Sequence, residues 1–149
     1  MKRTGRLRHR SKTNSRPWEN LTFRRQYMDG VMWCEVQPLF PPSELFGKLP
    51  IMMADDPHHI CGGANGSQRW DVLTNLIGVS RPVHDWLERY RPEGMVLCIK
   101  AKTDKGEYDD AAMKSVLGLT RPGASVFSYI RIRRMQFDWV QEILDGFPE

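Results

Sequence analysis

Three of the four histidines in this 149-residue chain fall within one stretch, residues 56–86. The stretch contains the pair His58-His59, then a Gly-rich segment, then Asn75 and finally His84. Imidazole changes charge near neutral pH and is also the commonest metal ligand. This clustering predicts a fold in which distant segments meet at one site, where a divalent metal ion lies beside a general base.

Two short extended segments are predicted on either side of the Gly-rich segment. Residues 50–54 form an apolar run that leads to the histidine pair, and residues 70–77 form a second run that contains Asn75. Residues 61–67 (CGGANGS) lie between the two and have the composition of a loop. The pattern therefore predicts a strand, a loop and a second strand.

A helix is predicted to follow directly, and it carries the third histidine of the stretch. Ser80 is a typical N-cap residue, and Pro82 fits the first turn of a helix. Apolar side chains then recur at i, i+3, i+4 and i+7, the spacing of one helix face, at Val83, Trp86, Leu87 and Tyr90. His84 lies at the edge of this face, and Glu88 follows one turn later on the same side. The helix can therefore pack on the sheet and present His84 at the seam.

The rest of the chain adds helical segments to a single core, because the length suits one domain. Helical patterns that end at glycine occur at residues 109–117 and 138–144, whereas residues 95–101 fit helix and strand periods equally. We expect an α+β protein with a basic flexible arm and one domain. The expected boundaries are 1–20 for the arm and 21–149 for the domain, with its core at about 31–91 and a mostly helical accessory part at 92–149.

Positive charge is concentrated at the N-terminal end. Residues 1–25 contain nine Lys or Arg and one acidic residue, whereas residues 26–149 contain 13 basic and 17 acidic residues. Such a segment suits a polyanion, because each phosphate it neutralises releases a counterion; a solvated disordered terminus is the alternative. The arginines predicted to contact DNA phosphates are Arg24, Arg25, Arg69 and Arg81, and for the last two an ordinary surface role is equally compatible with the pattern.

Other features of the composition narrow the setting. No run of 18 apolar residues occurs, and no apolar segment follows the basic residues as in a secretory signal. Three widely spaced cysteines do not indicate a disulfide framework. We therefore expect a cytoplasmic protein without membrane contact.

The order of these residues resembles the HNH endonucleases, which have a ββα-metal fold. In that family a His follows an Asp or His and precedes an apolar residue, as in residues 58–60 (HHI). An Asn-Leu pair comes after a Gly-rich loop, as in residues 75–76, and the last His stands nine residues after that Asn, as His84 does. The resemblance covers roughly residues 31–91 and implies a small ββα-metal core with nuclease activity.

The resemblance implies a role for each matching residue. His59 would be the general base that takes a proton from water. His58 and His84 would hold one divalent metal ion, which stabilises charge on the scissile phosphate and the leaving 3′ oxygen. Asn75 would tie the loop backbone and orient His59. Nitrogen ligands favour Mn²⁺, Ni²⁺ or Zn²⁺, but phosphate oxygens and water can complete the coordination shell of Mg²⁺. The identity of the metal ion therefore stays open.

Two acidic residues near the motif are further candidates. Asp56 could be a carboxylate partner of a metal-bound imidazole. Glu88 occupies a position where some relatives place another metal ligand. An ordinary loop acid for Asp56, and a salt-bridged or solvated side chain for Glu88, are the alternatives.

The chain departs from the family pattern at the structural zinc. Many members carry two Cys-x-x-Cys pairs, whose positions correspond here to Cys34 with Gln37 and to Ser80 with Val83. Structural zinc needs four good ligands, so no structural zinc is expected. We expect packing to fill its place, with contributions from the aromatic residues Trp33, Phe40 and Trp86.

The resemblance therefore predicts a metal-dependent DNA endonuclease or nickase, with double-stranded DNA as its partner. A catalytically inactive module of the same fold, which binds nucleic acid or a protein assembly, is the alternative that the missing zinc cysteines favour. Small members of the family occur in phages and prophages, where some assist DNA packaging, so phage packaging proteins are implied as partners. RNA as the substrate stays open.

Overall fold

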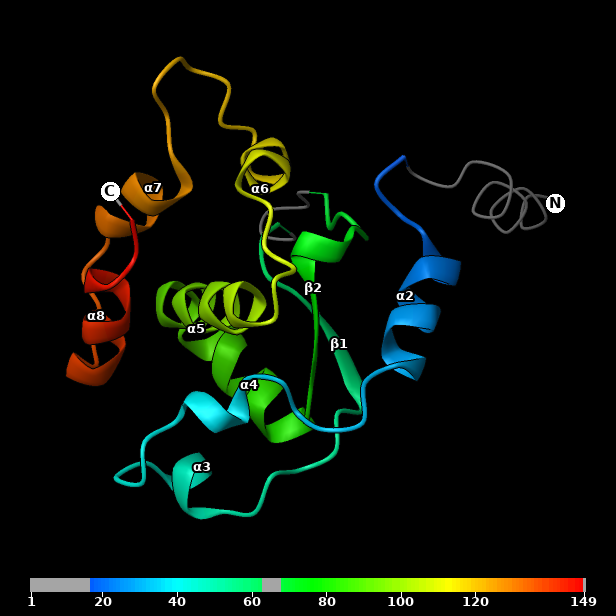
Figure 1. Cartoon of the computed structure of the whole chain (residues 1–149), viewed down its shortest axis with the longest axis vertical. Helices are drawn as coiled ribbons and strands as arrows, with labels where there is room; N and C mark the ends of the chain where they lie inside the picture. The colour runs from blue at the N-terminus through cyan, green and yellow to red at the C-terminus, as the bar shows by residue number, and fades with distance from the viewer. Residues whose placement is uncertain (1–16, 63–67, 149) are drawn as a thin grey trace, which may run out of the picture.

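The computed structural model describes residues 17–62 and 68–148, which form an α+β structure (Figure 1). An antiparallel hairpin lies between helix α2 on one side and the remaining helices on the other. The elements in chain order are α2 (Leu21–Asp29), the 3-10 helix η1 (Gln37–Leu39), α3 (Leu45–Lys48), β1 (Asp56–His59), the 3-10 helix η3 (Leu73–Asn75), β2 (Leu76–Val79), α4 (Arg81–Arg89), α5 (Arg91–Asp104), α6 (Asp110–Leu117), α7 (Val126–Arg131) and α8 (Asp138–Asp145).

The hairpin consists of β1 and β2, with His58 opposite Ile77 and His59 opposite Leu76. The prediction of a strand at residues 50–54 was wrong. In this segment only Met53 makes a β-type bridge, to Trp33, and the strand instead contains the histidine pair itself. A strand with the sequence DPHH has no apolar alternation, so a pattern-based search passes over it.

Asn75 also lies in a different element from the one predicted. It ends the 3-10 turn η3 and does not lie within an extended segment. β2 begins at the next residue, and all four of its residues are buried. A continuous apolar strand of this kind is covered on both faces, here by α2 and by the hydrophobic core that includes buried residues of α4 and α5.

Helix α4 confirms the predicted helix. The side chain of Ser80 caps it by accepting a hydrogen bond from the backbone N–H of Val83. Pro92 and Gly94 follow this helix in the sequence and have the residue types that commonly end one, but both lie in the first turn of α5. Proline is tolerated there, because the first N–H groups of a helix lack intrahelical partners. A Cβ atom on Gly94 would lie 2.9 Å from the carbonyl oxygen of Leu87, so glycine permits the close approach of α5 to α4.

Helix α5 resolves the ambiguous segment at residues 95–101. It is buried on most of its surface and packs against α4, α7 and α8. A helix that is apolar on nearly all sides shows no clear amphipathic period, which explains why its sequence fitted two periods. The predicted helices at 109–117 and 138–144 are confirmed as α6 and α8, and Gly118 ends α6 in the left-handed conformation with φ of 72°.

The segment around Cys34 and Gln37, where packing was expected in place of structural zinc, is held by a carboxamide and by aromatic side chains. Gln37 is buried; its Nε2 lies 3.0–3.3 Å from three backbone carbonyl oxygens, and its Oε1 accepts a hydrogen bond from the N–H of Met52. Phe40 and Trp86 pack edge to face, with ring centroids 4.9 Å apart. Trp33 does not take part as expected, since it is 54% exposed.

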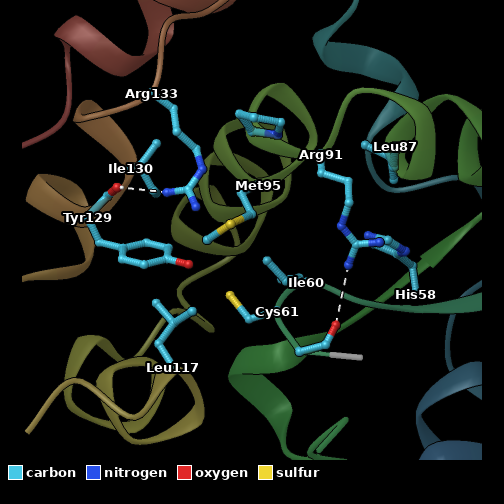
Figure 2. Close-up of a pocket in the computed structure, with 12 residues that line it drawn as sticks. His58, Ile60, Cys61, Leu87, Arg91, Met95, Leu117, Tyr129, Ile130 and Arg133 are labelled. Atoms are coloured by element: carbon cyan, nitrogen blue, oxygen red, sulfur yellow. Dashed lines mark hydrogen bonds between the residues drawn. The ribbon is translucent and has the colours of Figure 1, made fainter. Parts of the chain in front are cut away.

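Two cavities open near the end of β1. One, of about 280 Å³, lies between β1, the first turn of α5 and α7 (Figure 2). The other, of about 370 Å³, lies between β1, α2 and α4. No helix among the described residues is both long and apolar enough to cross a membrane.

Candidate metal centre and catalytic site

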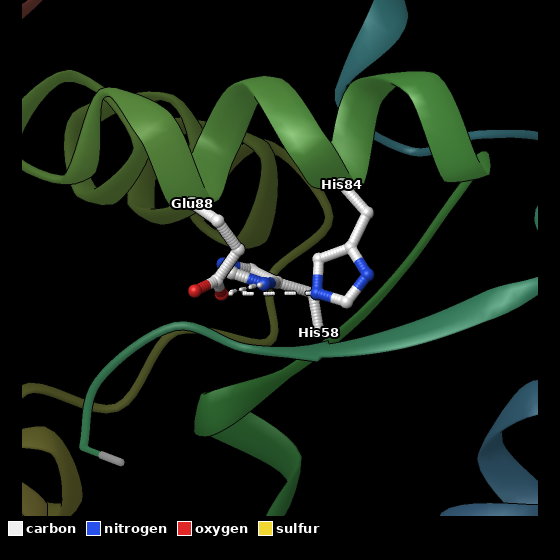
Figure 3. Close-up of side chains that lie close together, drawn as sticks. All are labelled: His58, His84 and Glu88. Atoms are coloured by element: carbon white, nitrogen blue, oxygen red, sulfur yellow. Dashed lines mark ion pairs between the residues drawn. The ribbon is translucent and has the colours of Figure 1, made fainter. Parts of the chain in front are cut away.

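His58, His84 and Glu88 come together where helix α4 crosses strand β1 (Figure 3). Ser80 alone separates β2 from α4, so the helix turns back directly over the neighbouring strand. His84 and Glu88 are one turn apart on α4 and point towards His58 on β1. One ligand atom from each residue lies within 4.8 Å of the others. Ligand atoms that bind the same metal ion have a similar spacing, because each of them lies about 2 Å from the ion.

His58 is the most buried member of this group, at 5% exposure. Its Nδ1 lies 3.4 Å from Glu88 Oε2 but has no hydrogen-bond partner among the described residues. Burial lowers the pKa of His58 to about 3, with further contributions from His84, His59 and Arg91. The ring is therefore neutral at physiological pH, the form in which imidazole binds metals. A buried nitrogen lone pair without a partner fits a metal ligand better than a structural histidine.

His84 is oriented by an acidic residue, as metal-binding imidazoles usually are. Its Nδ1 lies 3.2 Å from Asp56 Oδ2, which leaves Nε2 on the side of the cluster, 3.7 Å from Glu88 Oε2. Asp56 also pairs with Arg81, at 2.9 Å. The carboxylate can therefore fix both the tautomer and the direction of the His84 ring.

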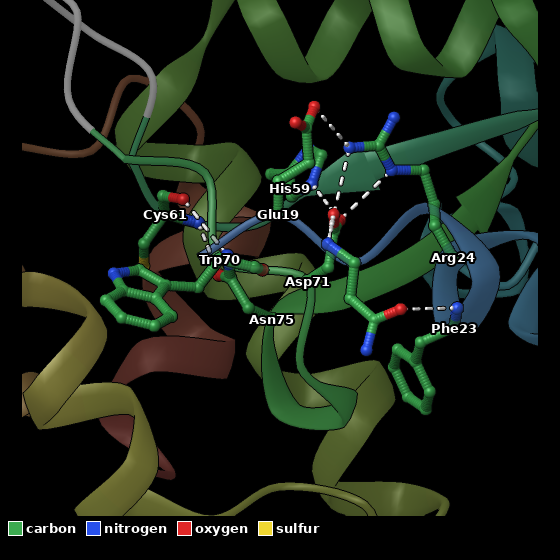
Figure 4. A network of polar contacts seen from close by, with 9 residues as sticks. Glu19, Phe23, Arg24, His59, Cys61, Trp70, Asp71 and Asn75 are labelled. Carbon is green, nitrogen blue, oxygen red and sulfur yellow. Dashed lines mark hydrogen bonds and ion pairs between the residues drawn. The ribbon is translucent and has the colours of Figure 1, made fainter. Parts of the chain in front are cut away.

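His59 follows His58 on the strand, and its side chain reaches a different partner. Its Nε2 lies 2.8 Å from Asp71 Oδ1 (Figure 4). The Asp71 side chain is fully buried and also accepts hydrogen bonds from Arg24 and from the backbone N–H of Asn20. Asp71 is acceptor-only, so the proton of a neutral His59 belongs on Nε2 and the lone pair on Nδ1.

The pKa values of this group follow from burial and from its hydrogen bonds. Burial lowers the pKa of His59, and the Asp71 carboxylate acts in the opposite direction without cancelling the shift. Burial alone would raise the pKa of Asp71, but hydrogen bonds from Arg24, Asn20 and His59 outweigh it and lower the value. The pair therefore consists of an ionised carboxylate and a neutral imidazole, which is ready to accept a proton.

Asn75 holds the loop after the histidine pair. Its Oδ1 accepts a hydrogen bond from the N–H of Cys61 at 2.8 Å, and its Nδ2 donates to the carbonyl oxygens of Cys61 and Trp70. The amide thus ties together the two ends of the segment between β1 and η3, as the sequence suggested. It makes no hydrogen bond to the His59 ring among the described residues; Asp71 makes that bond.

The larger cavity brings the two halves of the site together. His59, His84 and Glu88 all line it, and so do the arginines Arg24, Arg69, Arg81 and Arg91. Arg25 is exposed on α2 and is not among the residues that line this cavity. Four guanidinium groups around one cavity suit a phosphodiester backbone, because each can form charge-assisted bonds to phosphate oxygens.

Sequence reasoning missed two residues of this site. Asp71 orients His59, and Arg91 donates to Glu88 Oε1 at 2.8 Å and to the carbonyl oxygen of Gly62 at 3.3 Å. Asp71 is part of no recognisable sequence motif, so no spacing relates it to the histidines. Arg91 lies three residues after Glu88, a spacing that predicts a helical pair only when one helix continues through both.

Comparison of the chain with protein-family models, with curated proteins and with solved structures gave no match. The chemistry of the donor set therefore has to indicate the ion. Two imidazole nitrogens and one carboxylate oxygen suit Mn²⁺, Ni²⁺ or Zn²⁺ better than Mg²⁺, which prefers oxygen ligands.

Proposed function

We propose that this protein is a metal-dependent endonuclease or nickase of the HNH type that hydrolyses phosphodiester bonds in DNA. The observation that carries the proposal is the buried Nδ1 of His58, which lacks a hydrogen-bond partner among the described residues and faces two further ligands. The antiparallel hairpin followed by α4 supports a ββα-metal core.

The residues of the chain have separate tasks in this mechanism. His59 takes a proton from the attacking water through Nδ1 as the oxygen approaches phosphorus. Asp71 keeps the opposite nitrogen, Nε2, protonated and holds the ring in place, so the base is aimed before the substrate arrives. Asn75 fixes the backbone that follows the base, at Cys61.

His58, His84 and Glu88 would hold the divalent ion, with Asp56 and Arg91 orienting two of them. When bound, the ion supplies stabilisation of the negative charge on the phosphate and on the leaving 3′ oxygen. The described part of the chain offers three ligands at this point, and three protein ligands leave coordination positions for water and substrate oxygens, as in catalytic sites. This count favours a nuclease over an inactive module of the same fold, in which a fourth protein ligand would close the site.

The charge distribution supports DNA as the substrate. Arg24, Arg69 and Arg81 line the same cavity as His59, and the basic arm, which lies largely outside the described residues, adds further positive charge. Arg24 pairs with Asp71, and Arg81 pairs with Asp56. The two arginines would therefore connect a bound DNA backbone to the carboxylates that orient the histidines.

Cleavage of supercoiled plasmid tests the proposal. We expect purified protein to nick the plasmid with at least one of Mn²⁺, Ni²⁺, Zn²⁺ or Mg²⁺, and EDTA to abolish the reaction. The variant His59→Ala should lose about 100-fold or more in rate, because a general base contributes that much. Its far-UV circular dichroism should match that of the wild type, and its thermal midpoint, lowered by the loss of the hydrogen bond to buried Asp71, should stay well above the assay temperature.

The variant His9→Ala is the matched control, because it removes the histidine outside the site and should cleave normally. Intact plasmid with every ion, under conditions where the protein still binds DNA, would leave the inactive binding module as the better assignment. Full activity of His59→Ala would remove the base from the mechanism.

A further inference from the structure

The smaller cavity, of about 280 Å³, lies beside the metal cluster and has no task in the mechanism above. His58 lines it, and it shares Gly62 and Arg91 with the larger cavity. The two cavities are therefore neighbours on either side of the Arg91 side chain. A phosphodiester bound at the metal cluster would bring its adjoining nucleoside to the opening of this second space.

The floor and walls of this cavity are mainly apolar. Ile60, Met95, Leu117 and Ile130 contribute aliphatic or thioether side chains, and Tyr129 contributes an aromatic ring (Figure 2). A planar ring can therefore be buried against Tyr129 and Met95 without loss of hydrogen bonds at its faces.

The rim is positively charged and carries hydrogen-bond donors. Arg133 stacks over Tyr129, with its guanidinium carbon 4.8 Å from the ring centroid, and donates a hydrogen bond to the backbone carbonyl oxygen of Tyr129 at 3.4 Å; it forms no ion pair with a carboxylate among the described residues. Arg91 stands on the opposite side and pairs with Glu88. One exposed cation that is not neutralised, next to an apolar space, indicates a ligand that combines a flat apolar group with negative charge.

We infer that this cavity binds one unpaired nucleobase of the cut DNA strand, directly beside the scissile phosphate. The inference rests on the proposed nuclease function and extends it to the form of the substrate. The base stacks on Tyr129, and Arg133 and Arg91 contact the flanking phosphates or the edge of the base.

A paired base cannot enter this space. A duplex presents its bases edge-on inside the grooves, whereas a cavity of this size admits a single base only when the base leaves the stack. Extrusion from a perfect duplex costs a few kcal/mol and is cheapest at mismatches, gaps and single strands. The protein therefore prefers DNA with an unpaired nucleotide at the cleavage position over fully paired DNA.

Binding measured in EDTA tests this inference without catalysis. Fluorescence anisotropy would give the Kd of the full chain for a short duplex with one unpaired nucleotide and for the fully paired duplex. We expect the unpaired site to bind about tenfold more tightly, because stacking one base on an aromatic side chain contributes that much. Tyr129→Ala should abolish the difference and leave Kd for the paired duplex unchanged.

Two matched controls separate stacking and charge from general effects. Trp33→Ala removes an exposed aromatic side chain that does not line the cavity, and it should preserve the preference. Arg133→Gln should reduce the affinity for the unpaired site more than Arg134→Gln, which removes the neighbouring charge. A fluorescent adenine analogue at the unpaired position should be quenched by the wild type and not by Tyr129→Ala.

The outcomes distinguish this inference from the proposed function. Equal affinity for paired and unpaired duplexes, or a preference that Tyr129→Ala leaves intact, would overturn the base-binding cavity even if plasmid is cleaved. Should the preference depend on Tyr129 in a protein that never cleaves DNA, the cavity would stand and the nuclease assignment would fail.

Discussion

At the scale of single residues, the Asp71 carboxylate connects three parts of the chain. It accepts hydrogen bonds from Arg24 and Asn20 at the start of α2 and contacts His59 on β1. A fully buried carboxylate is tolerated only because these partners satisfy both of its oxygens. The residue that orients His59, the proposed general base, thus also anchors α2 to the hairpin.

Replacing Asp71 should therefore lower stability as well as activity. We expect Asp71→Ala to reduce the free energy of unfolding by about 2 kcal/mol, because it leaves three hydrogen-bonding groups without their partner. Urea denaturation measures this value. Asp29→Ala, at an exposed position on α2, should change it by less than about 0.5 kcal/mol, and equal effects of the two changes would contradict the anchoring role.

The pKa of Asp71 also predicts how stability depends on pH. Because the pKa of this carboxyl is lower in the folded than in the unfolded protein, the ionised group contributes stability above about pH 4. This contribution to stability is lost as the pH falls through the pKa that the Asp71 carboxyl has in the folded protein. The difference in unfolding free energy between wild type and Asp71→Asn should therefore be largest near pH 6 and shrink towards about pH 3. A difference that stays constant over this range would show that the shift is absent.

At the scale of elements, Gln37 does for the segment before β1 what a structural metal does in other small proteins. Its carboxamide lies within hydrogen-bond distance of the backbone of Phe46, Leu49, Pro50 and Met52. Residues 49–52 follow α3 and lie in no helix or strand, and the carbonyl oxygens of Leu49 and Pro50 and the N–H of Met52 have the Gln37 side chain as their partner.

We expect Gln37→Ala to lower the free energy of unfolding by about 3 kcal/mol, since it removes several buried hydrogen bonds at once. Gln37→Glu should be at least as harmful, because a carboxylate offers no donors to the three carbonyl oxygens. Chemical denaturation measures both variants, and Gln26→Ala on the exposed side of α2 is the control. A wild-type value for Gln37→Ala would mean that the segment is held by other contacts.

Local signals at helix ends explain which elements could be predicted. α4 and α6 begin at capping residues, Ser80 and Asp109, and Gly118 ends α6, so their ends depend on neighbours in the sequence. α5 and β1 lack such signals. α5 is surrounded by other helices, so its sequence lacks a polar face. β1 has histidines, which belong to the candidate site, at positions that are apolar in an ordinary strand.

At the scale of the whole molecule, the chain combines an arginine-lined cavity with an N-terminal sequence that is strongly basic. Residues 1–16 contain seven Lys or Arg and no acidic residue. Binding of DNA by such a segment depends steeply on salt, because each neutralised phosphate releases counterions.

A variant with these seven residues replaced by Gln should bind duplex DNA more weakly and with a smaller salt dependence. The slope of log K against log salt should fall in magnitude by up to about 6 between about 50 and 200 mM salt. Fluorescence anisotropy measures the slope. Exchanging the five arginines of this segment for lysine keeps the charge and should keep the slope; an unchanged slope in the Gln variant would show that the arm does not contact DNA.

The sequence by itself determined the residue types and spacing of the histidine cluster and the ends of the capped helices, because these depend on neighbours one or two turns apart. Only the tertiary structure decided that Glu88 joins His58 and His84, that Asp71 holds His59, and that a cavity opens beside Arg91. Arg24 and Asp71, for example, are 47 residues apart, so no local pattern relates them. Their contact exists because α2 and the segment before β2 pack on the same side of the hairpin.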